Sequence, residues 1–271
     1  MITLNSDAAS TSLSKTTKAI LNEYGIKLNK NLGQNYLIDR NKRDQIIQFG
    51  NLTKDDVVLE IGPGIGTLTI ELAKRVKKVI AIEQDSNICQ ILENRLKKEN
   101  IDNVDLINDD ALNVEFPKFD KIISNLPYQI SSPITFKFLN YNFQLAILMY
   151  QKEFASRMNG KVGSKNYSRL SAMLYFKCDV DLLTGVSAES FIPKPKVDST
   201  VVRLTPKLPE LNGQLKHLNI NEINEKDFKT YSKFVKALFQ HRNKKVKNAL
   251  IDSRPVSYTH LTLPTTLGCR S

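Results

Sequence analysis

The sequence has few of the features that mark a membrane protein, a disulfide-bonded secreted protein or a metal centre. Its apolar runs, such as residues 145–149, are far too short to span a bilayer. The three cysteines (Cys89, Cys178 and Cys269) are scattered, show no metal-ligand spacing and cannot all pair, which favours a reducing, cytoplasmic setting. The three histidines are scattered too, so we expect no metal site. Residues 1–13 lack the basic and apolar regions of a secretory signal, and we expect a frayed tail there.

Positive charge is what the sequence has in excess. Its 271 residues include 39 lysines and arginines against 28 aspartates and glutamates, which gives a net charge of +11. Such a charge favours an anionic partner, and nucleic acid is the commonest one, although basic residues can also serve solubility alone. The length is enough for one sizeable domain and a smaller one. We expect a monomer that has no membrane partner.

Apolar periodicity predicts an alternation of strands and helices. The expected strands are residues 57–61, 79–83, 104–107, 120–124, 143–149, 180–186 and 197–204. The expected helices are residues 15–24, 40–49, 67–76, 86–98, 152–158, 167–176 and 229–240. Asp39 and Asp85 directly precede two of these helices and are expected to be their N-caps.

A glycine-rich loop follows the first strongly apolar strand. Glycines at 62, 64 and 66 let the backbone approach a ligand closely and keep the strand-to-helix turn tight. The spacing is GxGxG and not the GxGxxG of dinucleotide-binding loops. Together with Glu60 just before it, this spacing favours the variant of the Rossmann-like fold that binds S-adenosylmethionine.

Carboxylates end the next two expected strands. Glu83 follows four apolar residues, at a distance from the glycines where an acid commonly accepts hydrogen bonds from a ribose diol. An exposed glutamate at a strand end is the alternative. Asp109 and Asp110 follow the third strand, and the two acids could also be a solvated turn.

Residues 124–128 have the sequence Ser-Asn-Leu-Pro-Tyr and follow an apolar strand, at a place where open α/β sheets bind ligands. An amino group on an aromatic ring is a poor nucleophile because its lone pair is delocalised into the ring. Hydrogen bonds to the Asn125 side-chain oxygen and to a backbone carbonyl would draw such a group toward a reactive geometry. Pro127 stiffens the turn, and Tyr128 offers a face on which a base can stack. An ordinary Asn-Pro turn with a surface tyrosine is the alternative.

With these blocks the sequence resembles the ribosomal RNA adenine dimethyltransferase family, specifically the small-subunit dimethyladenosine transferases. The matching blocks are residues 31–39, 59–66, 82–83, 109–111, 125–128 and 191–199. They follow one another in family order, which makes the match specific where a single block would not be. The resemblance implies an α/β fold with a Rossmann-like Class I methyltransferase core and a small helical C-terminal domain.

The resemblance also implies an activity and a set of site residues. The activity is transfer of methyl groups from S-adenosyl-L-methionine to two adjacent adenines of small-subunit ribosomal RNA, each methylated twice, without a metal. The residues expected to bind the cofactor are Asn35, Leu37, Gly62, Gly64, Glu83, Asp110 and Asn125. The expected catalytic residues are Asn125, Leu126, Pro127, Tyr128 and Phe191. Phe191 would be the second face of an aromatic clamp opposite Tyr128, although a phenylalanine usually belongs to a core.

Three basic segments are expected to contact RNA, or the immature small ribosomal subunit, although each could be a solvated surface. They are the loop at 159–166, the segment at 191–196 and the run at 241–247. Prolines in the second segment are expected to hold it extended and out of any sheet. The residues predicted to contact RNA are Lys161, Lys165, Lys194, Lys196, Arg242, Lys244 and Lys245.

Composition shifts suggest how the chain is divided. We expect a tail and short helix over 1–27, the methyltransferase domain over 28–205 and a partial helical RNA-contacting domain over 206–253. Residues 254–271 turn abruptly rich in Thr, Leu and Pro and look like a translated adapter or a frame-shifted end. We therefore expect that this last stretch is not native and does not pack stably.

Two other functions are compatible with the same core. One is a large-subunit ribosomal RNA adenine methyltransferase that confers antibiotic resistance, and the other is a non-catalytic RNA-binding factor of ribosome assembly. The block at 191–199 and the basic C-terminal helices favour the small-subunit enzyme. The presence of Glu83 and of residues 125–128 argues against a non-catalytic protein, although an enzyme could also act as an assembly checkpoint.

Overall fold

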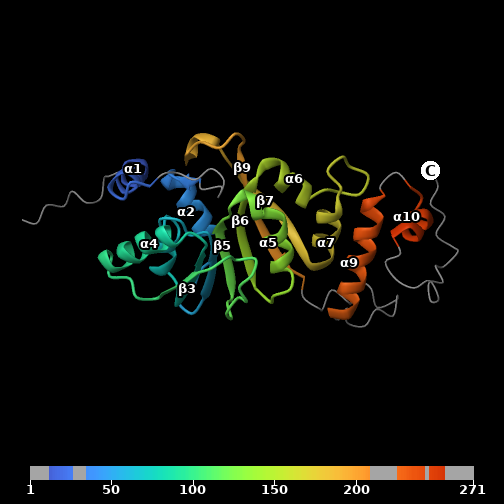
Figure 1. The fold of residues 1–271 in the computed structure, drawn as a ribbon, viewed down its shortest axis with the longest axis horizontal. Coiled ribbons are helices and arrows are strands. Elements are labelled where there is room, and N and C mark those ends of the chain that lie inside the picture. The colour runs from blue at the N-terminus through green and yellow to red at the C-terminus, as the bar shows by residue number, and fades with distance from the viewer. Residues whose placement is uncertain (1–11, 27–34, 208–224, 242–243, 254–271) are drawn as a thin grey trace, which may run out of the picture. The chain divides into compact units, whose positions relative to one another are not determined.

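The computed structural model describes residues 12–26, 35–207, 225–241 and 244–253 (Figure 1). The chain divides into two compact units, residues 1–207 and 208–271. The stretch at 254–271, predicted to be non-native, lies outside the described residues. The functional boundaries predicted from the sequence stay predictions.

A seven-stranded sheet forms the centre of the first unit, with the strand order β4-β3-β2-β5-β6-β9-β7 (Figure 1). Its strands are Val57–Ile61 (β2), Lys78–Glu83 (β3), Val104–Asn108 (β4), Lys121–Asn125 (β5), Leu145–Gln151 (β6), Cys178–Val186 (β7) and Ser199–Pro206 (β9). Strands β2 to β6 pair in parallel, whereas β9 is antiparallel to both β6 and β7. The strand order reverses where β2 lies between β3 and β5, and ligands bind at such switch points in open sheets. The predicted α/β, Rossmann-like fold is confirmed.

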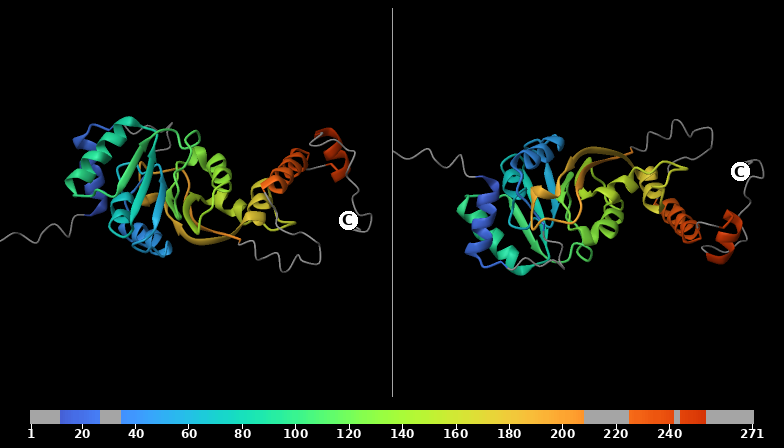
Figure 2. Two further views of the ribbon diagram at one scale, coloured as in Figure 1. Left: turned by 90° about the horizontal axis from the view of Figure 1, so that it is seen from below. Right: turned by 90° about the horizontal axis from the view of Figure 1, so that it is seen from above.

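Helices pack on both faces of this sheet, and Figure 2 shows α4 and α5 on opposite faces. The helices of this unit are Leu13–Glu23 (α1), Arg40–Phe49 (α2), Thr69–Ala73 (α3), Ser86–Lys98 (α4), Ser131–Phe138 (α5), Lys152–Met158 (α6) and Arg169–Lys177 (α7). The described residues of this unit also form the short 3₁₀ helices Tyr128–Ile130 (η3) and Ala188–Ser190 (η4). Both predicted N-caps are confirmed: Asp39 accepts from the Lys42 N–H at 3.1 Å, and Asp85 accepts from the Asn87 N–H at 2.9 Å. The helix predicted at 67–76 is shorter at both ends: the turn around Gly66 extends through residue 68, and a further turn follows α3 at residues 74–75.

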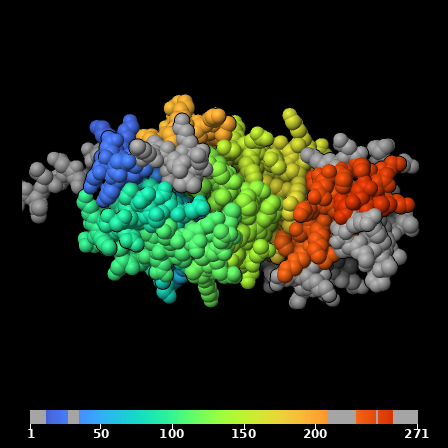
Figure 3. All heavy atoms as spheres, viewed as in Figure 1, coloured from blue at the N-terminus to red at the C-terminus, as the bar shows by residue number. Residues whose placement is uncertain are grey.

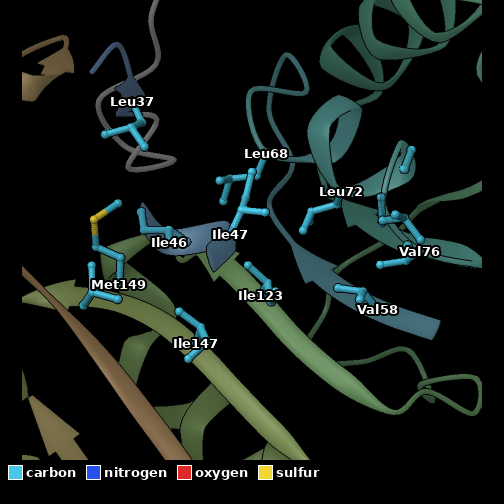
Figure 4. Packing of buried hydrophobic residues seen from close by; sticks show 14 of the residues in the cluster. Leu37, Ile46, Ile47, Val58, Leu68, Leu72, Val76, Ile123, Ile147 and Met149 are labelled. Atoms are coloured by element: carbon cyan, nitrogen blue, oxygen red, sulfur yellow. The ribbon is translucent and has the colours of Figure 1, made fainter. Parts of the chain in front are cut away.

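Apolar side chains fill the space between the sheet and helices α2 and α3 (Figure 4). Ile46 and Ile47 of α2 and Leu72 of α3 belong to the same cluster as Ile123 and Ile147 of the central strands. These residues are almost fully buried. Consecutive residues of the central strands are buried, so both faces of these strands are packed. This packing holds their carboxyl ends in position.

A second, two-stranded sheet joins segments that are far apart in the sequence. Tyr36–Leu37 (β1) pairs antiparallel with Phe191–Ile192 (β8), with Leu37 opposite Phe191. The expectation that the prolines keep all of 191–196 out of a sheet is therefore wrong for its first two residues. The pairing ends before Pro193, which has no N–H to donate. The contact is extended by Ser190, whose carbonyl accepts from the Ile38 N–H at 2.8 Å.

The second unit contains helices Glu225–Gln240 (α9) and Val246–Ser253 (α10). Phe228, Val235 and Ala237 of α9 and Ala249 and Leu250 of α10 are buried. The amphipathic helix predicted at 229–240 is confirmed as the larger part of α9. Across the ranges that the structure describes, no helix is long and apolar enough to cross a membrane.

A buried ion pair at the amino end of β5 yields a stability prediction. The Lys121 ammonium donates to Asp56 at 2.9 Å and to the Asn51 carbonyl at 2.7 Å, and both charged side chains are only 8% exposed. Asp56→Ala leaves a buried charge unpaired, and such losses cost about 3–5 kcal/mol. We expect that decrease in the free energy of unfolding in urea titrations followed by circular dichroism. Asp55→Ala, at an exposed neighbouring position, is the control; an equal effect of the two substitutions would contradict the prediction.

Candidate active site

A pocket opens at the carboxyl ends of β2, β3 and β5, at the switch point of the sheet. It is lined by residues 35–37, 60–64, 67–68, 82–84, 109–111 and 125–130. The fold therefore brings together five of the six sequence blocks, all except residues 191–199. Every residue predicted to bind the cofactor lies in this lining, as do four of the predicted catalytic residues, Asn125 to Tyr128.

The glycine loop is packed so closely that side chains would not fit. Gly62 has φ 66° and Gly64 has φ 56°, in the left-handed region that favours glycine. A Cβ on Gly62 would lie 3.0 Å from the ring of Pro127, and one on Gly64 would lie 2.9 Å from the ring of Tyr36. Both glycines are therefore required by backbone conformation and by space.

Glu83 connects the glycine loop to the start of α4. Its carboxylate accepts from the Gly64 N–H at 3.1 Å and from the Asp85 N–H at 3.1 Å. Burial raises the pKa of Glu83, and the hydrogen bonds from Asp85 and Gly64 oppose that shift. The alternative of an ordinary exposed glutamate is excluded, because the side chain is held in the lining of the pocket.

The two acids after β4 form an ordered turn at the pocket edge. Asp110 accepts from the Leu112 N–H at 2.8 Å, and Asp109 accepts from the Asp110 N–H at 2.7 Å. Sequence reasoning missed Lys137 of α5, whose ammonium donates to the carbonyls of Ala111 at 2.8 Å and of Leu112 at 3.2 Å. Nothing in the sequence around Lys137 signals this role, because the contact joins α5 to a turn distant in the chain.

Asn125 is oriented by a hydrogen bond from its side chain. Its Nδ2 donates to the backbone carbonyl of Asn35 at 3.0 Å. The preceding Ser124 is buried and donates to the Ile61 carbonyl at 2.6 Å, which fixes the end of β5 against the end of β2. This bond distinguishes the nitrogen of the amide from its oxygen, and Oδ1 is the atom of this side chain that can accept from a ligand.

The two aromatic residues of the predicted clamp lie in different environments. Tyr128 lines the pocket, and its hydroxyl is 2.6 Å from the hydroxyl of Ser199. Burial raises the pKa of Tyr128. Phe191 is only 2% exposed, belongs to the core cluster with Leu37 and is not among the described residues that line the pocket. Phe191 pairs with Leu37 across the small sheet, and its role as the second face of a clamp opposite Tyr128 stays a prediction.

Two further residues of the pocket have buried polar atoms without a hydrogen-bond partner among the described residues. They are Glu60, through Oε2, and Tyr36, through its hydroxyl. Burial raises the pKa of Glu60 to about 8, and burial also raises the pKa of Tyr36. Glu60 could be suspected from the sequence as a pocket residue because it lies just before the glycines. No separate feature of the sequence singled out Tyr36.

The lining of the pocket is acidic although the chain is basic. Four carboxyl groups line it, from Glu60, Glu83, Asp109 and Asp110, and the described lining residues include no Lys, Arg or His. A pocket of this composition favours a cationic ligand and disfavours a phosphate. Within the described ranges, no group of His, Cys, Asp and Glu is placed to hold a metal ion.

Six of the residues predicted to contact RNA are described, and none of them is among the described residues that line this pocket. Lys161, Lys165, Lys194 and Lys196 of the first unit are exposed, and so are Lys244 and Lys245 of the second. Lys194 pairs with Glu189, and Lys244 pairs with Asp252. Figure 3 shows the segment between β8 and β9, in light orange, at the surface of the first unit. Arg242 lies outside the described residues, and RNA contact by these residues stays a prediction.

The buried Glu60 predicts a pH dependence of stability. In the unfolded chain this carboxyl ionises near pH 4.5, but in the folded protein it keeps its proton to about pH 8. The folded state thus binds more protons between these values, so this group makes the free energy of unfolding fall as the pH rises from about 5 to about 8. Glu60→Gln cannot ionise and should remove that part of the slope in urea titrations at several pH values.

The control is Glu93→Gln, at an exposed position of α4, which should leave the pH slope as in the wild type. Equal slopes for the wild type and Glu60→Gln would show that Glu60 ionises in the folded protein at the same pH as in the unfolded chain, which would contradict the prediction.

Comparison with known proteins identifies the family. The sequence model of the family described as "Ribosomal RNA adenine dimethylase" matches residues 25–264. A protein of Methanosphaera stadtmanae named "Probable ribosomal RNA small subunit methyltransferase A" is 51% identical over 237 residues, which are 88% of this chain and 82% of the relative. A protein of the same name from Methanothermobacter thermautotrophicus is 47% identical over 237 residues, 88% of this chain and 80% of its own.

Solved structures agree with this assignment. A dimethyladenosine transferase from Plasmodium falciparum has a TM-score of 0.68 and 36% identity, covering 79% of this chain and 74% of its own. The 23S rRNA methyltransferase ErmE has a TM-score of 0.63 and 28% identity, covering 80% of this chain and 84% of its own. By the extent of the family match and the identity of these relatives, the chain belongs to the ribosomal RNA adenine dimethylase family and is a methyltransferase whose cofactor is S-adenosylmethionine.

Proposed function

We propose that this chain dimethylates the exocyclic amino groups of two adjacent adenines in small-subunit ribosomal RNA. The observation that carries the proposal is the position of Asn125 in this family member: its amide is oriented by Asn35 at the edge of an acidic, glycine-lined pocket. The substrate would be the ribosomal RNA or the immature small subunit, met in the cytoplasm by a monomer.

The residues of the pocket fit the cofactor. S-adenosylmethionine supplies a methyl group on a sulfonium, which is already an activated electrophile. The carboxyl groups of Glu83, Asp109 and Asp110 in the lining suit that positive charge. Gly62 and Gly64 hold the loop in the conformation in which it lines the pocket. Glu83 would hold the ribose, Asp110 the adenine amino group, and the unpartnered Oε2 of Glu60 would accept from a donor group.

Asn125 would act on the amino group that is methylated. Its Oδ1 would accept one amino hydrogen, and the backbone carbonyl of Leu126 or Pro127 would accept the other. Two such acceptors hold the lone pair away from the ring and toward the methyl group. Pro127 adds no competing donor because it has no N–H. The rate gain comes from orientation and from excluding water around the amine.

Tyr128 would hold the target base by stacking on it. The base must leave its own stack to reach the pocket, which costs little for a nucleotide in a loop. Phosphates are disfavoured by the acidic lining, so the RNA backbone would be held outside the pocket by the exposed lysines. The neutral base is then the part of the RNA that enters.

The names of the relatives support the small subunit over the large one. The relatives that are 47–51% identical are named small-subunit methyltransferases, whereas the 23S enzyme is 28% identical. A non-catalytic assembly factor would not need the oriented Asn125 or the engaged Glu83. Both are in place, which supports an active enzyme.

Primer extension tests the proposed substrate. Small-subunit and large-subunit ribosomal RNA particles that lack the modification are incubated with the protein and S-adenosylmethionine. Stops at two adjacent adenines of the small-subunit RNA are expected, only when both protein and donor are present. Stops confined to the large-subunit RNA would contradict the proposal, and no stops in either RNA would favour the non-catalytic alternative.

Glu83→Ala is expected to weaken binding of S-adenosylmethionine. Hydrogen bonds to a charged group contribute about 1.5–3 kcal/mol, so the dissociation constant should rise about ten- to a hundredfold. Titration calorimetry measures the dissociation constant. Glu93→Gln, at an exposed position of α4, is the control and should bind the cofactor as the wild type does. Unchanged affinity in a folded Glu83→Ala variant would place the ribose elsewhere.

Asn125→Ala is expected to lower the methylation rate strongly while RNA affinity stays close to that of the wild type. The reason is that phosphate contacts dominate affinity, whereas Asn125 acts on the amine. Single-turnover methylation and filter binding on one RNA separate the two quantities. A variant that lost RNA affinity but methylated normally at saturating RNA would refute the chemical role.

A further inference from the structure

The hydroxyl groups of Ser199 and Tyr128 form a hydrogen bond. The two hydroxyl oxygens are 2.6 Å apart, and Ser199 is only 1% exposed. Tyr128 begins the short helix η3 at the pocket, whereas Ser199 begins β9 of the seven-stranded sheet. The bond therefore joins a ring of the pocket to a strand of the main sheet.

The backbone around Ser199 is fixed from several directions. In the sheet, Ser199 is in register with Gln151 of β6 and with Val186 of β7. The neighbouring Asp198 accepts from the Ala188 N–H at 3.0 Å through its side chain and from the Lys152 N–H at 3.0 Å through its carbonyl. The sheet pairing and these hydrogen bonds hold the Ser199 backbone in place, so its hydroxyl offers Tyr128 a partner at a fixed position.

The segment that ends at Ser199 carries two of the residues predicted to meet phosphates. Lys194 and Lys196 are exposed between β8 and β9, a few residues before Ser199. The same stretch of chain therefore carries two exposed lysines and ends at the buried hydroxyl that bonds to Tyr128.

We propose that Ser199 is a positioning residue for the target base, which acts by fixing the direction of the Tyr128 ring through the hydroxyl pair. The inference rests on the proposed function, in which that ring stacks on the adenine. Without the bond the phenol can turn about its side-chain torsions, and the base is held less often in line with Asn125. The loss should appear in turnover and not in binding of the cofactor.

The chain offers a matched control in a second buried hydroxyl pair. Thr135 of α5 and Tyr150 of β6 have their hydroxyl oxygens 2.7 Å apart, and both residues are fully buried. Neither is among the described residues that line the pocket. Tyr150→Phe removes the same kind of bond from the core without touching the site.

The test compares Ser199→Ala, Tyr128→Phe, the double variant, Ser199→Thr and Tyr150→Phe. At saturating RNA, Ser199→Ala and Tyr128→Phe should each lower the single-turnover rate about fivefold to tenfold, as expected for one hydrogen bond. The double variant should be no slower than either single one, because both remove the same bond. Ser199→Thr keeps the hydroxyl and should restore most of the rate.

Cofactor affinity by calorimetry and RNA affinity by filter binding should be unchanged in all variants, and Tyr150→Phe should methylate at the wild-type rate. Additive losses in the double variant, or equal losses in Ser199→Ala and Tyr150→Phe, would overturn the positioning role. A wild-type protein that does not methylate the RNA would instead overturn the proposed function and this inference with it.

Discussion

The approach of three chain segments at Gly62 and Gly64 is the constraint on which the site depends. The ring of Pro127 lies against Gly62, the ring of Tyr36 lies against Gly64, and the N–H of Gly64 donates to Glu83. A side chain at either glycine would push β5 or β1 away from β2. These contacts set the distance between Glu83, which is proposed to hold the ribose, and the turn that carries Asn125. Asn125 lies two residues before Pro127.

Charge is separated in this protein between the surface and the pocket. The chain has a net charge of +11, but four carboxyl groups and no described basic residue line the pocket. Glu60 adds no negative charge to the lining below about pH 8, because burial keeps its carboxyl protonated, so the other three carboxyl groups set the preference for a cation. In the proposed function, this separation would direct a sulfonium cofactor and an RNA phosphate to different places on one molecule, so that a polyanion would deliver a neutral base to a cationic methyl donor.

Local sequence signals predicted the elements well, and long-range contacts account for what they missed. Apolar runs located the strands, Asp39 and Asp85 marked two helix starts, and chain order assigned the blocks that the structure gathers in one pocket. The pairing of Leu37 with Phe191, the bond from Ser199 to Tyr128 and the capping of a distant turn by Lys137 join residues far apart in sequence. Periodicity along one element carries no information about such contacts.

In the proposed mechanism, Asn125 acts only if the methyl group of the bound cofactor faces its side-chain oxygen. A crystal structure of the protein with S-adenosylmethionine bound tests it most directly. We predict that the ribose hydroxyls lie within hydrogen-bonding distance of Glu83 and that the methyl group faces the side-chain oxygen of Asn125. A cofactor bound with its methyl group turned away from Asn125, or bound outside this pocket, would contradict the account.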